Sequence, residues 1–162
     1  MKPLHREIIT TFEDLINARQ ERYLDLKEDL DADSSINVSK LDTESINITR
    51  IHGRWNQVYN DEYLHLDNAK ERLKKVRLER WKYYLGKQSS KYYADYGNFN
   101  EEVLRTDADK YVDADDIVQQ AQELVNIDKA IVSLLDRFLK ELSSRNFHIK
   151  NAIDYRKFLA GE

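Results

Sequence analysis

The chain has 162 residues, of which 41% are hydrophobic and 35% charged, with 26 basic and 30 acidic residues and a formal net charge of −4. This composition allows one domain with a modest core, and the absence of cysteine excludes disulfides, thiolate nucleophiles and cysteine-based zinc sites. Four glycines and one proline are present, and because these residues punctuate β-turns, their scarcity predicts an all-α, elongated single domain of long helices.

The first predicted helix occupies residues 1–30. Pro3 suits the first helical position, and apolar residues such as Phe12 and Leu26 recur at helical spacing on one face. Residues 31–39 are rich in Asp, Ser and Asn, whose side chains favour turns and caps over helix interiors. We therefore expect a linker after the first helix.

A second region, residues 31–91, combines this linker with a helix predicted from about residue 41 to Gly86, with an interruption near Asn60. Residues 70–91 carry nine basic side chains against two acidic ones, so this segment is net +7 and the rest of the chain net −11. Tryptophan and tyrosine rings interleave with these cations. A single nucleic-acid strand needs cations for its phosphates and flat rings for its unstacked bases, so we predict that this block binds single-stranded DNA.

The basic block leaves other functions open. Taken alone, a helix of this kind is equally typical of a solvated face, and Trp81 is also compatible with a core position. A helical scaffold or assembly chaperone, whose basic helix binds an acidic protein partner, is the alternative function, and RNA would offer the same phosphates and base faces as DNA. The residues predicted to contact the strand are Lys74, Lys75, Arg77, Arg80, Trp81, Lys82, Tyr83, Tyr84 and Lys87.

Residues 92–113 show no sustained period and are predicted to form a connecting loop with a short helix around residues 99–104. Its aspartates are expected to be solvated and to cap the next helix. Calcium is not expected, because an EF-hand loop starting at Asp107 would need Gly and Glu where Val112 and Val118 stand. The four histidines are scattered without ligand spacing, so we expect no metal, no other cofactor and no enzymatic site.

Residues 114–162 carry two adjacent apolar rows, a face wider than one partner helix covers, and are predicted to form helices that drive oligomerisation. Asp128 interrupts one row, so we expect this carboxylate to be paired or hydrated and to fix the register between helices. The long helix is predicted to end at residues 143–146, with a short helix over 147–160. The predicted oligomerisation residues are Leu124, Ile131, Leu135, Phe138, Leu142, Ile149 and Ile153.

Two blocks of the chain resemble a known family. Residues 144–150 (SRNFHIK) and 154–162 (DYRKFLAGE) are similar to a C-terminal pattern S-R-G-F-x-I-K, then D-x-R-x-F-x-A-G. Residues 74–87 (KKVRLERWKYYLGK) are similar to a basic block K-K-V-x-L-x-x-x-x-Y-Y-x-G-R/K. Both patterns are those of the UvsY family of recombination mediators from T-even-type tailed phages. The resemblance covers roughly residues 24–162 and leaves the first helix outside.

This resemblance implies a non-enzymatic accessory of homologous recombination in the cytoplasm of the infected host cell. It would bind single-stranded DNA, contact the phage single-strand-binding protein and a RecA-like recombinase, and load the recombinase onto covered strands as a hexameric or heptameric ring. No apolar run approaches the roughly 18 residues of a membrane span, so no membrane contact is expected.

The chain departs from the family at one point of the basic block. The family's DNA-contacting pair, K-x-R, would fall here on Glu79 and Trp81, so these two charges are not carried over. The remaining cations, such as Arg77 and Lys82, do not share one narrow helix face. Either the DNA path is rotated, with Trp81 stacking on a base, or the alignment slips locally by one residue.

Overall fold

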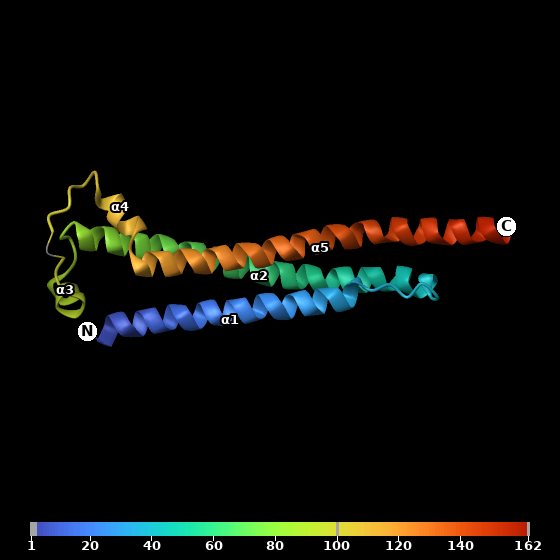
Figure 1. Cartoon of the computed structure of the whole chain (residues 1–162), viewed down its shortest axis with the longest axis horizontal. Helices are drawn as coiled ribbons and strands as arrows, with labels where there is room; N and C mark the ends of the chain where they lie inside the picture. The colour runs from blue at the N-terminus through green and yellow to red at the C-terminus, as the bar shows by residue number, and fades with distance from the viewer. Residues whose placement is uncertain (1–2, 100, 162) are drawn as a thin grey trace. The chain divides into compact units, whose positions relative to one another are not determined.

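Five α-helices make up the part of the chain that the computed structural model describes, residues 3–99 and 101–161, with side chains described from Phe12 onward. No strand occurs within these ranges, and the predicted all-α fold of long helices is confirmed. Within the same ranges, no helix combines the length and apolar character that crossing a membrane requires. Figure 1 follows the helices in chain order, which are α1 (Pro3–Ser34), α2 (Leu41–Tyr84), α3 (Ser90–Tyr96), α4 (Ala108–Asp113) and α5 (Asp116–Ala160).

The first compact unit of the chain combines the residues up to Arg22 with His65–Lys129. Each of the three long helices contributes a segment to it, and their apolar faces supply its core because side chains three and four residues apart share a face. One buried cluster of this unit consists of Phe12, Ile117 and Ala121, with the partly buried Leu73 and Val76 packed against it.

Asp128 lies within this unit and is only 2% exposed. Its carboxylate accepts a hydrogen bond from Arg19 Nε at 2.6 Å, which joins α5 to α1 through an ion pair. The expected pairing of this buried charge is thus present. Its role in fixing the register between helices stays a prediction.

The second compact unit comprises Tyr23–Leu64 and the residues from Ala130 onward. Trp55 of α2 is 2% exposed and packs edge-to-face on Phe138 of α5, with ring centroids 5.5 Å apart. The indole Nε1 donates to the Asp33 carboxylate at 2.7 Å. This contact fixes the end of α1 on α2, because Asp33 lies in the last turn of α1.

Most of the predicted oligomerisation residues are core residues of the chain itself. The apolar face of α5 packs on α1 and α2 of the same chain. This packing explains the apolar pattern without a second subunit, and a role of these residues in oligomerisation stays a prediction. Leu124, Ile131, Leu135, Phe138, Leu142 and Ile149 are buried, and Ile153 is partly buried.

Helix α5 runs without a break, so the predicted end at residues 143–146 is wrong. The Ser143 hydroxyl donates to the carbonyl of Leu139 at 2.9 Å, and the Ser144 hydroxyl donates to that of Glu141 at 2.8 Å. These serines therefore bond back along their own helix instead of capping it. Helix α2 is also continuous through the predicted interruption near residue 60.

The end of α1 likewise differs from the prediction, because α1 extends to Ser34 and only the residues after it form the linker. Arg145 of α5 is 8% exposed and donates to the carbonyls of Asp33 and Ser34, both at 2.9 Å. Carbonyls in the last turn of a helix lack partners within the helix. The guanidinium of Arg145 supplies the missing hydrogen-bond donors. It thereby stabilises the last turn of α1, although the composition of this stretch favours a turn.

Between α2 and α5, the described part of residues 99–104 contains no helix, so the short helix predicted there is wrong. Two other short helices form instead. The Ser89 hydroxyl accepts the N–H of Tyr92 at 3.2 Å and starts α3, and Gly97, with φ of 86°, follows its end. Helix α4 covers the acidic stretch before α5.

Candidate nucleic-acid interface

The residues of the basic block lie on different faces of α2. Residues three and four apart share a helix face, and Lys75, Leu78 and Lys82 form one such row. Lys74 and Trp81 form a second row that meets the first at Leu78. All three lysines are exposed, and Leu78 is 55% exposed. We call these five residues the solvent row.

Beyond the helix, Lys87 extends the solvent row. Gly86, with φ of 70°, donates its N–H to the Tyr83 carbonyl, while the Lys87 N–H donates to the Lys82 carbonyl at 2.8 Å. This is a Schellman ending, and it confirms that Gly86 ends α2. The turn leaves the Lys87 ammonium 5.2 Å from the ring centroid of Trp81, so a cation and a flat ring lie side by side.

Lys74 and Arg77 of the predicted DNA-contacting residues form exposed ion pairs. Lys74 donates to Glu71 at 2.7 Å, and this hydrogen bond raises the pKa of Lys74 and lowers that of Glu71. Arg77, whose side chain is 40% exposed, lies 2.8 Å from a carboxylate oxygen of Asp113. Exposed pairs of this kind contribute little stability, so a phosphate can compete for either cation.

Arg80 points into the interior and is only 6% exposed. Its Nε donates to Asp115 at 2.7 Å, and its guanidinium also donates to the Tyr92 hydroxyl at 3.4 Å. The guanidinium carbon lies 4.2 Å from the ring centroid of Tyr83 and 5.5 Å from that of Tyr84. We call these five residues the Arg80 cluster. Burial takes Arg80 out of reach of a phosphate, which corrects its assignment to DNA contact.

Asp115 joins the Arg80 cluster to the start of α5. One carboxylate oxygen accepts from Arg80 and, at 2.8 Å, from the Tyr84 hydroxyl. The other accepts the N–H groups of Ile117 at 3.0 Å and Val118 at 3.3 Å, which is the geometry of a helix N-cap. The sequence predicted capping by an aspartate of this stretch, but gave no signal for its ion pair with α2.

The surroundings of the Arg80 cluster raise the pKa of three of its members. Burial raises the pKa of Tyr84 to about 12, and the hydrogen bond to Asp115 adds to this shift. Burial also raises the pKa of Tyr92. Burial alone would lower the pKa of Arg80, but the charge of Asp115 and the hydrogen bond to Tyr92 outweigh it and raise the pKa. Tyr84 and Tyr92 therefore stay neutral phenols beside the charged guanidinium of Arg80 at neutral pH.

The predicted base-stacking tyrosines pack on other rings of the chain. Tyr83 is 8% exposed and stacks on Tyr93, with centroids 5.8 Å apart. Tyr84 meets Phe99 edge-to-face at 4.9 Å. These contacts leave Tyr83 little ring surface for a base, whereas Tyr84 is only partly buried and its stacking on DNA stays a prediction. Among the predicted stacking residues, Trp81 is the ring that lies on the solvent row.

The nine predicted DNA-contacting residues therefore fall into three groups. Sequence reasoning missed Leu78, the apolar centre of the solvent row, although its spacing from Lys74 and Lys82 was a usable signal. The exposed group is Lys74, Lys75, Lys82 and Lys87, the partly buried group is Arg77, Trp81 and Tyr84, and the buried group is Arg80 and Tyr83.

Most of the chain matches one known protein family. Residues 29–162 match the family model described as "Recombination, repair and ssDNA binding protein UvsY". None of the curated proteins matches the chain. The matched range includes the solvent row and the Arg80 cluster, and leaves most of α1 outside.

Crystal structures of the bacteriophage T4 recombination mediator protein UvsY share the fold. One is 20% identical with a TM-score of 0.75 and covers 84% of this chain and 98% of its own. A second crystal form is 23% identical with a TM-score of 0.73 and covers 84% of this chain and 96% of its own.

Proposed function

Because the chain belongs to the UvsY family, we propose that it is a recombination mediator that binds single-stranded DNA through the solvent row of α2. In this proposal it performs no catalysis itself. It loads a RecA-like recombinase onto strands covered by single-strand-binding protein, in the cytoplasm of the phage-infected host cell. The family description supports recombination, repair and single-strand binding, and the solvent row supplies a surface with the required chemistry.

The main support for this proposal is that exposed lysines and Trp81 lie on the same side of α2. A single strand offers phosphates and unstacked base faces along the same path. Stacking on an aromatic ring contributes about 1 to 3 kcal/mol per base, and each phosphate contact adds about −0.7 to the slope of log affinity against log salt. A duplex hides its base faces, so the ring would add nothing there.

We also propose that the chain self-associates through the end of α5. Four large apolar side chains of this segment are exposed, unlike those on the earlier turns of α5. Exposed apolar patches are typical of protein contacts, and a hexameric or heptameric ring would place many weak DNA sites on one strand. The side chains are Phe147 (65% exposed), Tyr155 (63%), Phe158 (76%) and Leu159 (65%).

Fluorescence anisotropy with single-stranded DNA, duplex DNA and RNA of equal length, across a salt series, tests the proposed function. We expect tightest binding to the single DNA strand, with affinity falling as salt rises. Recombinase loading on strands covered by single-strand-binding protein is then the second assay. Weak binding to all three nucleic acids at low salt would contradict the proposal and favour a scaffold whose basic helix binds an acidic protein.

A further inference from the structure

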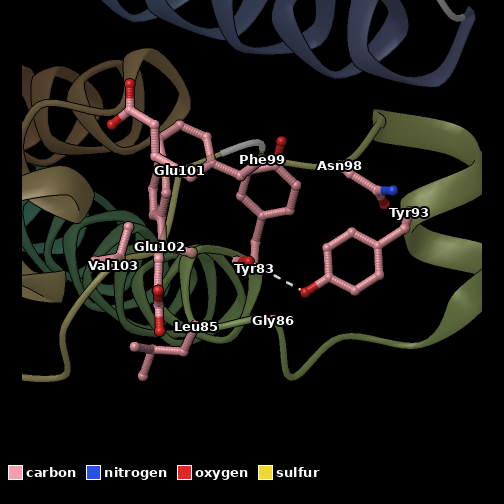
Figure 2. Close-up of a pocket in the computed structure, with 10 residues that line it drawn as sticks. Tyr83, Leu85, Gly86, Tyr93, Asn98, Phe99, Glu101, Glu102 and Val103 are labelled. Carbon is pink, nitrogen blue, oxygen red and sulfur yellow. Dashed lines mark hydrogen bonds between the residues drawn. The ribbon is translucent and has the colours of Figure 1, made fainter.

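A recess of about 570 Å³ lies beside the Arg80 cluster, where α2 ends (Figure 2). Aromatic rings from α2, α3 and the following loop form much of its wall, and two glutamates of that loop complete it. Both glutamates are exposed to solvent. The rings and carboxylates that matter for its chemistry are Tyr83, Tyr84, Tyr93, Phe99, Glu101 and Glu102.

The wall of the recess is held in place by hydrogen bonds. The Tyr93 hydroxyl donates to the Tyr83 carbonyl at 3.1 Å, drawn as a dashed line in Figure 2, and it accepts the Gln88 N–H at 3.2 Å. In the same view, Glu101 and Glu102 lie on the side of the recess away from Tyr93. A ligand would therefore meet a ring already fixed in position, with the two glutamates on the other side of the recess (Figure 2).

The recess repeats the chemistry of the neighbouring Arg80 cluster, but its described lining includes no lysine or arginine. In the cluster, tyrosine rings and one carboxylate surround a guanidinium. In the recess, Glu101 is approached by the Tyr111 hydroxyl at 3.4 Å, and within the described residues no lysine or arginine pairs with Glu101 or Glu102. Nearby aspartates differ, because Asp107 and Asp113 are each paired with a cation.

Two cations of the solvent row, Lys75 and Lys82, lie on the side of α2 away from Tyr84. Lys82 precedes Tyr84 by two residues, which places the two side chains roughly 200° apart around the helix axis. Of the two faces, the one with the lysines suits phosphates, and the one with Glu101 and Glu102 repels them. The recess therefore does not serve the DNA path.

We propose that this recess binds an arginine or lysine side chain presented by a partner protein. The cation would lie against the ring faces and within hydrogen-bonding reach of Glu101 or Glu102, as Arg80 does with Asp115. This proposal is independent of DNA binding, since it uses the opposite face of α2. The recess would then be a negatively charged docking site for a protein, in addition to the positively charged solvent row.

The test uses a blocked tripeptide, acetyl-Gly-Arg-Gly-amide, and its citrulline counterpart, which has nearly the same shape without the charge. Protein labelled with 3-fluorotyrosine is followed by 19F NMR, and the Tyr93 signal is assigned with Tyr93→Phe. We expect the arginine peptide to shift the Tyr93 signal saturably and the citrulline peptide to leave it unchanged. Equal shifts with both peptides, or none with either, would overturn the proposal.

Matched variants separate the recess from the rest of the molecule. The double variant Glu101→Gln/Glu102→Gln should raise the dissociation constant of the arginine peptide by about tenfold, the loss of one charge-assisted hydrogen bond. Glu102→Gln alone should give an intermediate value, and Glu141→Gln, an exposed glutamate of α5, should behave as the parent. Single-stranded DNA affinity should not fall in any of them. Unchanged peptide binding in the double variant would contradict the site.

Discussion

The solvent row and the Arg80 cluster both combine cations with aromatic rings, and their α2 residues interleave over residues 74–84, yet they meet opposite surroundings. Lys82 is exposed, while Arg80, two residues earlier, is buried in an ion pair with Asp115. The 3.6-residue period of α2 decides between the two. A sequence block rich in basic and aromatic residues therefore does not form one surface. Its residues point to different sides of the helix, and one side is exposed while the other is buried.

The largest expected effect is a loss of stability when the buried ion pair of the Arg80 cluster is broken. Asp115→Ala would leave Arg80 buried without its partner and remove the cap of α5, so we expect the free energy of unfolding to fall by about 3 to 5 kcal/mol. Urea denaturation followed by circular dichroism measures this. The double variant Arg80→Met/Asp115→Leu removes both charges and should recover much of the loss. A change below about 1 kcal/mol for Asp115→Ala would show that the pair is not interior.

The next effect concerns the ring of the solvent row. Trp81→Ala should weaken binding of single-stranded DNA by about 1 to 3 kcal/mol while leaving the salt slope nearly unchanged, because a stacked ring carries no charge. Trp81→Phe should restore much of the affinity. Anisotropy titrations at several salt concentrations measure both quantities. Equal affinity for Trp81→Ala and the parent would assign Trp81 to packing instead.

A smaller effect is expected for Arg77, which belongs to neither the solvent row nor the Arg80 cluster. Arg77 is partly exposed and paired with Asp113, so Arg77→Ala should change stability by less than about 1 kcal/mol. If Arg77 contacts a phosphate in the complex, the salt slope should become shallower by about 0.7. A slope identical to that of the parent would remove Arg77 from the DNA surface.

The last effect is the pH dependence that the Arg80 cluster imposes, which appears only above about pH 10 and is absent at neutral pH. The pKa of Tyr84 is raised from 10.0 to about 12, so the folded state favours the neutral phenol. The stability that this provides is complete below pH 10 and is lost as pH rises through about 12. Tyr84→Phe should flatten that decline in unfolding experiments over this range. A parent and variant with the same pH profile would contradict the role of Tyr84.

The helix that carries both regions was predictable from the sequence, whereas their separation was not. The periodicity of α2 and its end at Gly86 were predicted, and the resemblance of the C-terminal and basic blocks to the UvsY family is confirmed. Arg80 stands where the apolar row of α2 calls for an apolar residue, which was the signal for its burial. Its partner Asp115 lies 35 positions further on, and a pairing over that distance leaves no local pattern.

Where the sequence misled, contacts between distant segments overrode local preference. The serines near residue 143 suggested a helix end, yet Arg145 bonds to the carbonyls of α1 and α5 continues. The width of the apolar face of α5 was read correctly as needing two neighbours. Those neighbours are α1 and α2 of the same chain, and most of α1 lies outside the range that matches the family, residues 29–162.

The most direct measurement compares the salt dependence of single-stranded DNA binding for two charge-matched double variants. Lys75→Gln/Lys82→Gln neutralises the solvent row, and Lys129→Gln/Lys150→Gln removes the same charge from exposed positions on α5. We predict that the slope of log affinity against log salt becomes shallower by about 1.4 in the first variant and stays at the parental value in the second. Equal slopes in the two variants would contradict the account, because binding would then follow net charge and not the face of α2.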